Sequence, residues 1–567
     1  MKKKVIPAII IIVLIIFFAG IFVLQQVLKK YSHSDEQADL KSYFNIADDS
    51  DVPILLNKEF TEEHARLLDG AYYLDFDSVR KYLNDRFYYG KEDGILVYTT
   101  PETIITAPVG ESTWQDTDGG SGDEESKTSI LDGEILYVSL DYVKKYTNFS
   151  YETFTEPNRM VMTTAWEDEQ VASVTRDTQV RLRGGVKSEV LREVEKDESV
   201  VVLEQLENWT KVVTHDAFIG YIENKRISDA ATKSPIPVTD YTEPEYSSLV
   251  RDHKINLGFH QIGGPGGNDT LSDVTAQAKS LNVISPTWFA VSSNDGSIRS
   301  FGSEAYVKSA HNKGLEVWAL LDNFTGGAEV STHEFLSYAQ SRANLIDNVV
   351  TQSLSLGVDG INLDFEMVSS EDGQSFVEFV RELSIACRRA GLVFSIDNYV
   401  PMNFNDYYDL EEQGVVADYV IIMGYDEHYA GSAEAGSVAS LGYVENGIIN
   451  TLKEVDPSKV INAVPFYTRI WHTKNGTLSS EAVSMKIAAN YVSNHSIELQ
   501  WDAGAGQNYG EFTESDGTFN QIWMEDATSI GQKIDSMKAG EIAGIASWSL
   551  GMETADVWDT IAEYVGG

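Results

Sequence analysis

The segment Gly357–Glu366 contains the residues whose types and spacing are best suited to acid chemistry. Its polar residues Asn362, Asp364 and Glu366 alternate with large apolar residues. Alternate side chains of a β-strand share a face, so these three are expected to point the same way, with neighbours roughly 6 to 7 Å apart. Carboxylates that are buried without a cation have raised pKa values, as a general acid requires. Glu366, at the end of the strand, is the expected proton donor.

A structural cluster of acids and a solvated edge strand are the alternatives to a catalytic site. The residues between the polar positions are all large and apolar, which favours a strand enclosed on both faces. Asp359 has the opposite parity and precedes the strand, so we expect it, with Gly360, to be a structural part of the motif.

The run Asp-Gly-Ile-Asn-Leu-Asp-Phe-Glu, residues 359–366, resembles the catalytic signature of glycoside hydrolase family 18. That family usually has Asp where this chain has Asn362, and its branch that acts on bacterial spore and cell walls looks similar and carries Asn there. Asn362 has no proton to exchange with Asp364 but can hydrogen-bond to it. We therefore predict retained activity with an altered acid limb of the pH profile. An Asn362→Asp variant with the parent's profile would refute this.

Three further segments resemble elements of the same family. Residues 423–426 (Met-Gly-Tyr-Asp) resemble its Met-x-Tyr-Asp element, and residues 465–469 resemble its substrate-lining segment. The resemblance implies that Tyr425 positions a substrate carbonyl and that Asp426 adds a carboxylate at the same rim. It also implies that Tyr467 and Arg469 donate hydrogen bonds, and that Trp548 stacks beneath the sugar at the cleavage point.

The expected mechanism depends on where a nucleophile could stand. Asp364 shares a strand with Glu366 and is poorly placed to reach the opposite face of a sugar. The resemblance implies instead that the substrate's own 2-acetamido oxygen attacks the anomeric carbon while Glu366 protonates the leaving oxygen. Asp364 then holds the acetamido N–H, Tyr425 positions its carbonyl oxygen, and water completes the reaction with retention of configuration.

A (β/α)₈ TIM barrel over residues 251–567 is expected to position these groups, because strands and amphipathic helices alternate there. Catalytic groups of such a barrel gather at the C-terminal ends of its strands. An α+β insertion is expected at about 472–540, with extra strands at 499–502, 510–514 and 520–524. The eight predicted barrel strands are 255–260, 283–290, 316–321, 360–365, 393–397, 419–423, 460–465 and 544–548.

The preceding residues are expected to form two smaller parts and a linker. Residues 31–170 contain a repeat with an offset of 64, as in Tyr73 and Tyr137 or Val97 and Val161, which predicts a duplicated α+β stalk domain. Each copy reads as a strand, a short helix and a strand, and is similar to the small stalk domains of copper amine oxidases. Residues 171–230 contain five short strands and resemble a bacterial Src-homology-3-type (SH3-like) small β-barrel. Residues 231–250 are Pro-rich and predicted to be a linker.

The N-terminus predicts a membrane anchor. Three lysines precede an apolar run of about 20 residues, enough for one bilayer crossing. The run is longer than the apolar core of a typical signal peptide, roughly 7 to 15 residues, so residues 1–30 are predicted to be an uncleaved signal anchor, with residues 5–28 in the membrane. The bulk of the chain is then expected outside the cell.

Charge and residue clusters argue against several partners and cofactors. A formal net charge of -44 disfavours nucleic acid and anionic lipid surfaces. The loop Gly263–Gly267 lacks the Lys-Ser/Thr of a phosphate loop, and His428 lacks a second histidine at metal spacing. We expect no metal and no cofactor.

Together these features predict a membrane-anchored glycoside hydrolase. By resemblance, it would cleave β-1,4 linkages next to N-acetylglucosamine in peptidoglycan or its fragments. A chitinase that acts on chitooligosaccharides is one alternative. A catalytically inactive, lectin-like wall protein is another, although retention of Glu366 argues against it.

Overall fold

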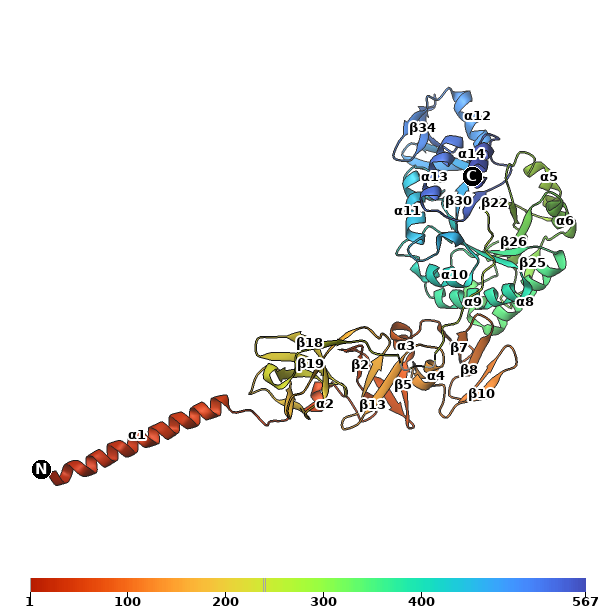
Figure 1. Cartoon of the computed structure of the whole chain (residues 1–567). Helices are drawn as coiled ribbons and strands as arrows, with labels where there is room; N and C mark the ends of the chain where they lie inside the picture. The colour runs from red at the N-terminus through yellow and green to blue at the C-terminus, as the bar shows by residue number, and fades with distance from the viewer. Residues whose placement is uncertain (1, 238, 240, 567) are drawn as a thin grey trace. The chain divides into compact units, whose positions relative to one another are not determined.

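The computed structural model describes residues 2–237, 239 and 241–566, and the chain divides into two compact units (Figure 1). The first comprises Met1–Phe87, Ala107–Trp114 and Gly122–Glu243. The second comprises Tyr88–Thr106, Gln115–Ser121 and Pro244–Gly567. Val238, Asp240 and Gly567, which fall in the predicted linker and barrel, lie outside the described residues, as does Met1 of the predicted anchor.

The second unit contains a closed barrel of eight parallel strands, which confirms the predicted TIM-barrel architecture. The first strand pairs with both the second and the last, and the second pairs with the third, so the ring is complete. The strands are β22 (Ile255–His260), β23 (Val283–Pro286), β26 (Glu316–Asp322), β27 (Gly360–Asp364), β28 (Val393–Tyr399), β29 (Tyr419–Met423), β30 (Val460–Pro465) and β36 (Gly544–Trp548). The helices around this ring include α6 (Glu304–Asn312), α8 (Ala339–Leu356), α9 (Gly373–Ala390), α10 (Leu410–Val416), α11 (Leu441–Thr451), α13 (Ala527–Ala539) and α14 (Val557–Val565) (Figure 1).

The second predicted strand is interrupted. After β23 ends at Pro286, the amide of Trp288 turns back to the Pro286 carbonyl at 2.8 Å, and the chain resumes as β24 (Phe289–Val291). Pro286 has no N–H to continue the ladder, which explains the break. β24 then forms an antiparallel hairpin with β25 (Ile298–Ser300) at the edge of the barrel.

Gly360 allows β27 to fit into the barrel. A Cβ at this position would lie 2.8 Å from the Val393 carbonyl oxygen of β28 and 2.9 Å from the Trp318 ring of β26. Both distances are shorter than a carbon atom tolerates, so a larger residue would push β27 away from its two neighbours. The glycine therefore fixes the strand that carries Asp364.

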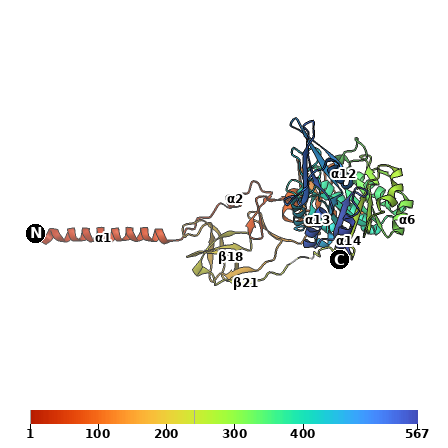
Figure 2. The same ribbon diagram turned by 90° about the horizontal axis from the view of Figure 1, so that it is seen from above.

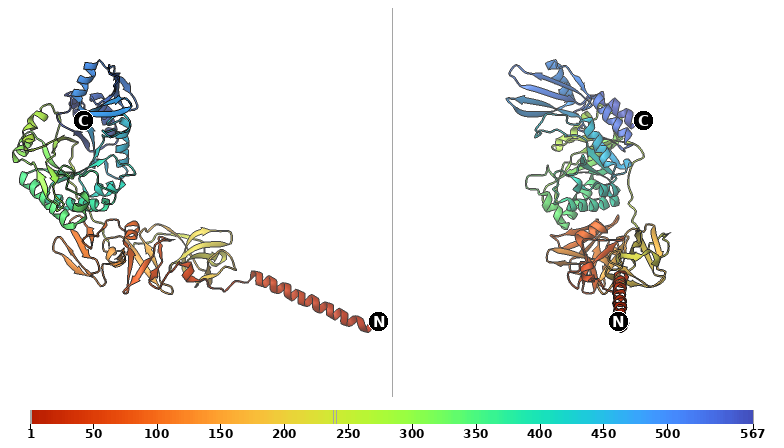
Figure 3. Two further views of the ribbon diagram at one scale, coloured as in Figure 1. Left: turned by 180° about the vertical axis from the view of Figure 1, so that it is seen from behind. Right: turned by 90° about the vertical axis from the view of Figure 1, so that its left-hand side faces the viewer.

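The insertion forms its own antiparallel sheet, in the order β32-β31-β35-β34-β33. It starts at Tyr467, earlier than predicted, because β31 (Tyr467–Lys474) and β32 (Thr477–Ser484) add a hairpin that the sequence did not suggest. β32 is mostly polar and largely exposed, so it lacks an apolar signal. The right-hand view of Figure 3 shows these strands, in blue, beside the barrel. The remaining elements are α12 (Met485–His495), β33 (Gln500–Asp502), β34 (Gln507–Thr513) and β35 (Phe519–Met524).

The repeat found in the sequence corresponds to a repeated set of elements. The first copy contains β5 (Ala71–Asp75), α3 (Phe76–Tyr82), β6 (Phe87–Gly90) and β7 (Ile95–Thr99). The second contains β12 (Ile135–Ser139), α4 (Leu140–Lys144), β13 (Ser150–Phe154) and β14 (Arg159–Thr163). β5 and β12 pair with each other in antiparallel fashion, so the two copies share a sheet.

The first copy also contributes to the second unit. Residues Tyr88–Thr106 belong to the second unit, where they contact α9. The Thr99 hydroxyl donates to Glu378, the Tyr88 and Ser375 hydroxyls lie 3.0 Å apart, and Arg388 donates to the Pro101 carbonyl at 3.0 Å. The barrel therefore includes a segment that precedes it by more than a hundred residues in the chain.

The five predicted strands of residues 171–230 lie in one antiparallel sheet of the first unit. Its order is β17-β16-β20-β19-β18-β15-β21, and the SH3-like resemblance stays a prediction. The last strand extends three residues into the segment predicted to be a linker. The whole sheet has seven strands, of which β16 to β20 are the five predicted ones: β15 (Glu169–Ser173), β16 (Thr178–Arg181), β17 (Val190–Val194), β18 (Ser199–Gln205), β19 (Trp209–Thr214), β20 (Ile219–Glu223) and β21 (Ala231–Lys233).

The N-terminal apolar run is one uninterrupted helix, α1 (Lys2–Tyr31), as Figure 2 shows. Residues Ile9–Tyr31 have a mean hydropathy of 2.8 and the length of a membrane span. Lys29 and Lys30 lie in its last turn. The length and composition of the helix are compatible with the predicted anchor, which stays a prediction.

Candidate active site

Glu366 lies two residues beyond the last residue of β27, at the carboxyl end of the barrel. Asn323, which follows β26, holds its backbone: the Glu366 N–H donates to the Asn323 side chain at 2.9 Å, and the Asn323 amide donates to the Glu366 carbonyl at 2.9 Å. The Tyr399 hydroxyl, from the end of β28, donates to Glu366 Oε2 at 2.7 Å. Two neighbouring strands therefore fix both the backbone and the carboxyl group.

The surroundings of Glu366 favour its protonated form. Burial raises the pKa of the half-buried carboxyl above its ordinary value, and the negative charges of Asp426 and Asp322 raise it further. The hydrogen bond from Tyr399 acts in the opposite direction. A carboxyl group kept protonated in this way can donate its proton to a leaving oxygen.

Three buried aspartates line up across neighbouring strands below Glu366. Asp322 of β26 pairs in register with Asp364 of β27. In the next pair of strands Asn362 is opposite Ser395, so the parallel register puts Asp397 beside Asp364. We call Asp322, Asp364, Asp397 and Glu366 the strand-end carboxylates.

The strand-end carboxylates differ in how they are satisfied. Asp322 accepts hydrogen bonds from the Phe324 and Thr325 amides and from the Thr325 hydroxyl. Asp364 and Asp397 each retain one buried oxygen, Oδ1, that has no hydrogen-bond partner among the described residues. Burial raises the pKa of both groups, and their negative neighbours raise them further.

Asn362 does not make the contact that we expected from the sequence. Its side-chain amide donates to Asp397 Oδ2, not to Asp364, and its oxygen accepts from the Ser395 hydroxyl at 2.6 Å. Both partners are on β28, because Asn362 faces that strand in the barrel register. Its link to Asp364 therefore runs through Asp397.

Tyr425 and Asp426 follow β29 and lie near the same carboxylates. The Tyr425 hydroxyl makes no hydrogen bond within the part of the chain that the structure describes. Burial raises its pKa, and the charges of Asp397 and Asp364 raise it further, so it remains a proton donor. Asp426 is exposed and accepts a hydrogen bond from the Tyr467 hydroxyl at 2.5 Å. The structure thus brings these two predicted tyrosines together, with ring centres 6.3 Å apart.

Trp548 and Asp364 line one cavity of about 700 Å³. The indole packs against Phe259, with ring centres 5.4 Å apart, and remains partly exposed. Arg299 of β25 lines the same cavity and is the only Lys or Arg among its described lining residues. A cavity of this size with an aromatic wall can hold a sugar.

The other predicted residues lie away from this cavity or serve the framework. Arg469 of β31 donates to Ser480 of β32 at 2.9 Å and does not line the cavity in the described part of the chain. Asp359 accepts a hydrogen bond from the Val317 amide at 2.8 Å and contacts His311 at 2.8 Å. These contacts tie the start of β27 to its neighbours, as a structural residue would.

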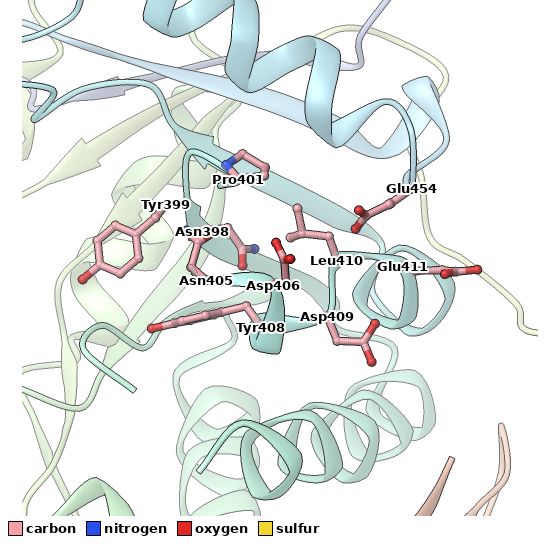
Figure 4. Close-up of a pocket in the computed structure, with 10 residues that line it drawn as sticks. All are labelled: Asn398, Tyr399, Pro401, Asn405, Asp406, Tyr408, Asp409, Leu410, Glu411 and Glu454. Carbon is pink, nitrogen blue, oxygen red and sulfur yellow. The ribbon is translucent and has the colours of Figure 1, made fainter. Parts of the chain in front are cut away.

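A smaller cavity of about 160 Å³ adjoins Tyr399 (Figure 4). Its acidic residues, Glu411 and Glu454 among them, lie across the view from the Tyr399 ring. Within the described residues, no group of three or more His, Cys, Asp or Glu side chains could hold a metal ion. The cavity therefore offers no recognisable metal site.

Sequence reasoning missed Asp322, Asn323, Asp397 and Tyr399. A signal existed, since each lies at the end of a predicted strand, where catalytic groups of a barrel gather. Asp397 and Tyr399 also have the two-residue spacing of Asp364 and Glu366. Which of these ends meet is set by the register between strands, and a single sequence does not reveal that register.

Comparison with known proteins adds a family to this geometry. The family described as "Glycosyl hydrolases family 18" matches residues 254–553. The protein YdhD of Bacillus subtilis (strain 168), whose name describes a sporulation-specific glycosylase, is 26% identical over 320 residues, 54% of this chain and 74% of that protein. The cortical fragment-lytic enzyme of the same organism is 25% identical over 226 residues, 38% of this chain and 52% of that enzyme.

A solved structure supports the fold of the second unit. The spore cortex-lytic enzyme SleL of Bacillus cereus superposes with a TM-score of 0.50 at 22% identity, covering 59% of this chain and 78% of that one. At this identity the similarity concerns the fold alone.

Proposed function

The chain belongs to glycosyl hydrolase family 18 and is a glycoside hydrolase, and from this premise we propose that it cleaves β-1,4 linkages next to N-acetylglucosamine in peptidoglycan or its fragments. The proposal depends chiefly on Glu366, whose raised pKa favours the protonated form and which lies two residues beyond Asp364, the last residue of β27. Asp364 and Trp548 line a cavity wide enough for a sugar, so a carboxylate for the acetamido N–H and a stacking surface are available to one substrate.

We propose a retaining, substrate-assisted mechanism. The strand-end carboxylates all come from the adjacent strands β26, β27 and β28, so a second carboxylate that could attack from the opposite face of the sugar is missing from this group. The acetamido oxygen of the substrate then attacks the anomeric carbon as Glu366 gives its proton to the leaving oxygen. Asp364 holds the acetamido N–H, and the unpaired Tyr425 hydroxyl donates to the acetamido oxygen. Water opens the cyclic intermediate, with Glu366 as the base.

The position of Arg299 in the wall of the cavity favours an anionic glycan over a neutral one as the substrate. Its guanidinium lies over the Phe301 ring at 4.2 Å, and its Nη2 donates to the hydroxyl and to the carbonyl of Thr325 at 2.8 and 3.3 Å. The N–H groups of Nε and Nη1 can donate to a carboxylate, and the positive charge of the guanidinium strengthens such bonds. N-acetylmuramic acid carries such a carboxylate and chitin does not. Relatives named cortical fragment-lytic enzymes point in the same direction.

The setting that we propose is the outer face of a cell membrane. Helix α1 serves as a single-pass anchor through residues 5–28, and the bulk of the chain lies outside the cell. The duplicated stalk domain acts as a spacer, and the SH3-like sheet binds wall peptides. Support for this arrangement comes from the mean hydropathy of 2.8 over Ile9–Tyr31 and from the lysines at the end of the helix.

The experiment compares two polymers. The full-length chain in detergent is incubated with purified peptidoglycan and with chitooligosaccharides, beside a Glu366→Gln control, and the new reducing ends are identified. Reducing-end N-acetylglucosamine released from peptidoglycan supports the proposal. Cleavage of chitooligosaccharides alone would instead make the protein a chitinase. Binding without cleavage of either polymer would favour a lectin-like protein.

A further inference from the structure

Asp397 is the buried carboxylate whose surroundings the proposed reaction leaves unexplained. It lies on β28 beside Asp364, at the same level of the barrel. The reason is the register: Asn362 and Ser395, two residues earlier in their strands, are opposite each other. It is 2% exposed and Asp364 is 5% exposed, so water does not solvate either group well. A second carboxylate next to Asp364 is costly unless a proton or a cation accompanies it.

The hydrogen bonds around the two aspartates leave one position open. Asp397 Oδ2 accepts from the Asn362 amide, whose orientation is fixed because Ser395 donates to the Asn362 oxygen. Oδ1 of Asp397 and Oδ1 of Asp364 are both buried without a partner among the described residues. Two acceptors cannot bond to each other, but one proton between them supplies a donor to each in turn.

We propose that Asp364 and Asp397 form a pair that holds one proton, and that Asp397 is the positioning residue that takes this proton when Asp364 engages the substrate. The carboxylate that family 18 usually has at position 362 then has its counterpart at position 397, on the next strand. This inference rests on the proposed substrate-assisted reaction for its catalytic consequence, although the shared proton itself does not require a substrate.

The proton balance of the step is simple. In the free enzyme the pair has one proton and a single negative charge. When the acetamido group binds, the proton passes to Asp397 and leaves Asp364 as the carboxylate that accepts the acetamido N–H. The negative charge then faces the positive cyclic intermediate, and the proton returns when product leaves.

The groups that face the pair support a retained proton. Asp322 of β26, Glu366 just beyond β27 and the Tyr425 hydroxyl beyond the end of β29 surround it, and none of them is a cation. Burial raises the pKa of both aspartates. The charges of Asp397, Glu366 and Asp322 raise the pKa of Asp364 further, and that of Glu366 does the same for Asp397, against the hydrogen bond from Asn362.

A test without substrate follows from the sign of this shift. A carboxyl whose pKa is higher in the folded than in the unfolded state stabilises the fold at low pH and loses that contribution as pH rises. From pH about 4, the ordinary value for a free carboxyl, the retained proton makes the unfolding equilibrium about tenfold more favourable per pH unit. Asp397→Asn removes one carboxylate, and its amide can donate to Asp364. The pH dependence of the unfolding equilibrium therefore weakens by about one proton.

The experiment uses the full-length chain and three variants. Asp397→Asn is expected to lower kcat about 30-fold with KM nearly unchanged, while the pH dependence of unfolding flattens. The double variant Asn362→Asp/Asp397→Asn, called the swap, moves the second carboxylate from position 397 to position 362. We expect it to restore both the pH dependence of unfolding and most of kcat. Asn362→Asp alone adds a third carboxylate and is expected to steepen the pH dependence, which provides a test if Asp397→Asn does not fold.

Two results would overturn the inference. One is an Asp397→Asn variant with kcat within about threefold of the parent and the parent's pH dependence of unfolding. The other is a swap that folds but restores neither property. If the parent chain hydrolyses no glycan at all, the proposed function fails, but the pH dependence of unfolding still tests the shared proton.

Discussion

Two clusters of buried carboxylates in the second unit are neutralised in different ways. The strand-end carboxylates face one another at the carboxyl end of the barrel, where no Lys or Arg in the described part of the chain forms an ion pair with them. The second cluster lies between α8, α9 and α10. There Arg342 holds Glu382 through two hydrogen bonds of 2.9 and 3.0 Å, and Arg381 binds Glu378 and Glu412 at 3.2 and 2.7 Å. We call this second group the helix ion pairs.

The difference separates carboxylates that titrate from carboxylates that hold the fold. Burial alone would lower the pKa of Arg342 and Arg381, but the facing glutamates raise both, so the two guanidinium groups stay charged. Burial also raises the pKa of Glu382, and there the charge of Arg342 acts in the opposite direction. Burial and negative neighbours instead raise the pKa values of Asp364, Asp397 and Glu366, which favours their protonated forms. Buried acids that lack a cation partner are thus the ones available for proton transfer.

The largest expected effect is that of Glu366→Gln. The amide has no proton to give to the leaving oxygen, so kcat should fall by about 10² to 10⁴-fold, the usual contribution of a general acid. Gln can still accept the hydrogen bond from Tyr399, so the fold should be unchanged. Reducing-end release and thermal unfolding measure the two properties. A loss of kcat smaller than tenfold would remove Glu366 from its role.

Arg381→Met tests the other cluster. It leaves Glu378 and Glu412 buried without their cation, and should destabilise the catalytic unit by about 3 to 5 kcal/mol, as for other broken buried pairs. The pH profile of the molecules that remain folded should not change. Urea unfolding followed by barrel tryptophan fluorescence measures the loss. Adding Glu378→Gln and Glu412→Gln to the variant should recover part of the stability, and a shifted pH profile would contradict the separation of the clusters.

Arg299→Gln tests the cation that lines the cavity. We expect about a tenfold loss of kcat/KM on peptidoglycan fragments, which corresponds to ~1.4 kcal/mol for a charged hydrogen bond, and less than a twofold loss on chitooligosaccharides. Arg299→Lys keeps the charge but not the paired donors, and should lie between the two. Fragments whose muramic carboxyl has been reduced to an alcohol provide the matched substrate control. Equal losses on both polymers would mean that Arg299 has only a structural role.

The smallest expected effect is a pH shift in Tyr399→Phe. The hydrogen bond from Tyr399 lowers the pKa of Glu366, so its removal should raise that pKa, by about 0.5 to 1 unit for a bond of ~1 kcal/mol. Because the reaction needs protonated Glu366, activity is lost as pH rises through this pKa. The alkaline limb of kcat/KM should therefore move to higher pH. A shift to lower pH would contradict the direction of the Tyr399 contribution.

The barrel could be predicted from the sequence because its strands are short apolar runs between turn signals. Six predicted strands end within a residue of the observed ends, and the Pro286 break explains the one that splits. The β31–β32 hairpin could not be predicted, since an exposed polar strand has no hydrophobic period. Glu366 and Asp364 stood out by their spacing within one strand. Asp322 and Asp397 did not, because their significance depends on neighbours from other strands.

The repeat, too, could be predicted from the sequence, but the contacts of its two copies could not. Its offset of 64 appears in the paired strands β5 and β12, whose first residues are Ala71 and Ile135. The sequence did not reveal that the first copy donates Thr99 and Tyr88 to the helices of the barrel, while the second copy's β14 pairs with β2 (Ile54–Leu56) in the first unit. Equivalent segments acquire different partners because their exposed faces differ in sequence.

The discontinuous make-up of the catalytic unit affects how an active enzyme could be shed. The chain passes between the two units at residues 87/88, 106/107, 114/115, 121/122 and 243/244. A protease that cuts only the Pro-rich stretch before Pro244 separates residues 244–567 from the rest of the chain, and they then stay attached only through their contacts with the upstream segments of the same unit. If residues 244–567 then separated from Tyr88–Thr106, the barrel would lose the contacts that this segment makes with α9. If α1 is the anchor that we propose, cleavage just after Tyr31, where α1 ends, would release an enzyme that keeps the whole second unit.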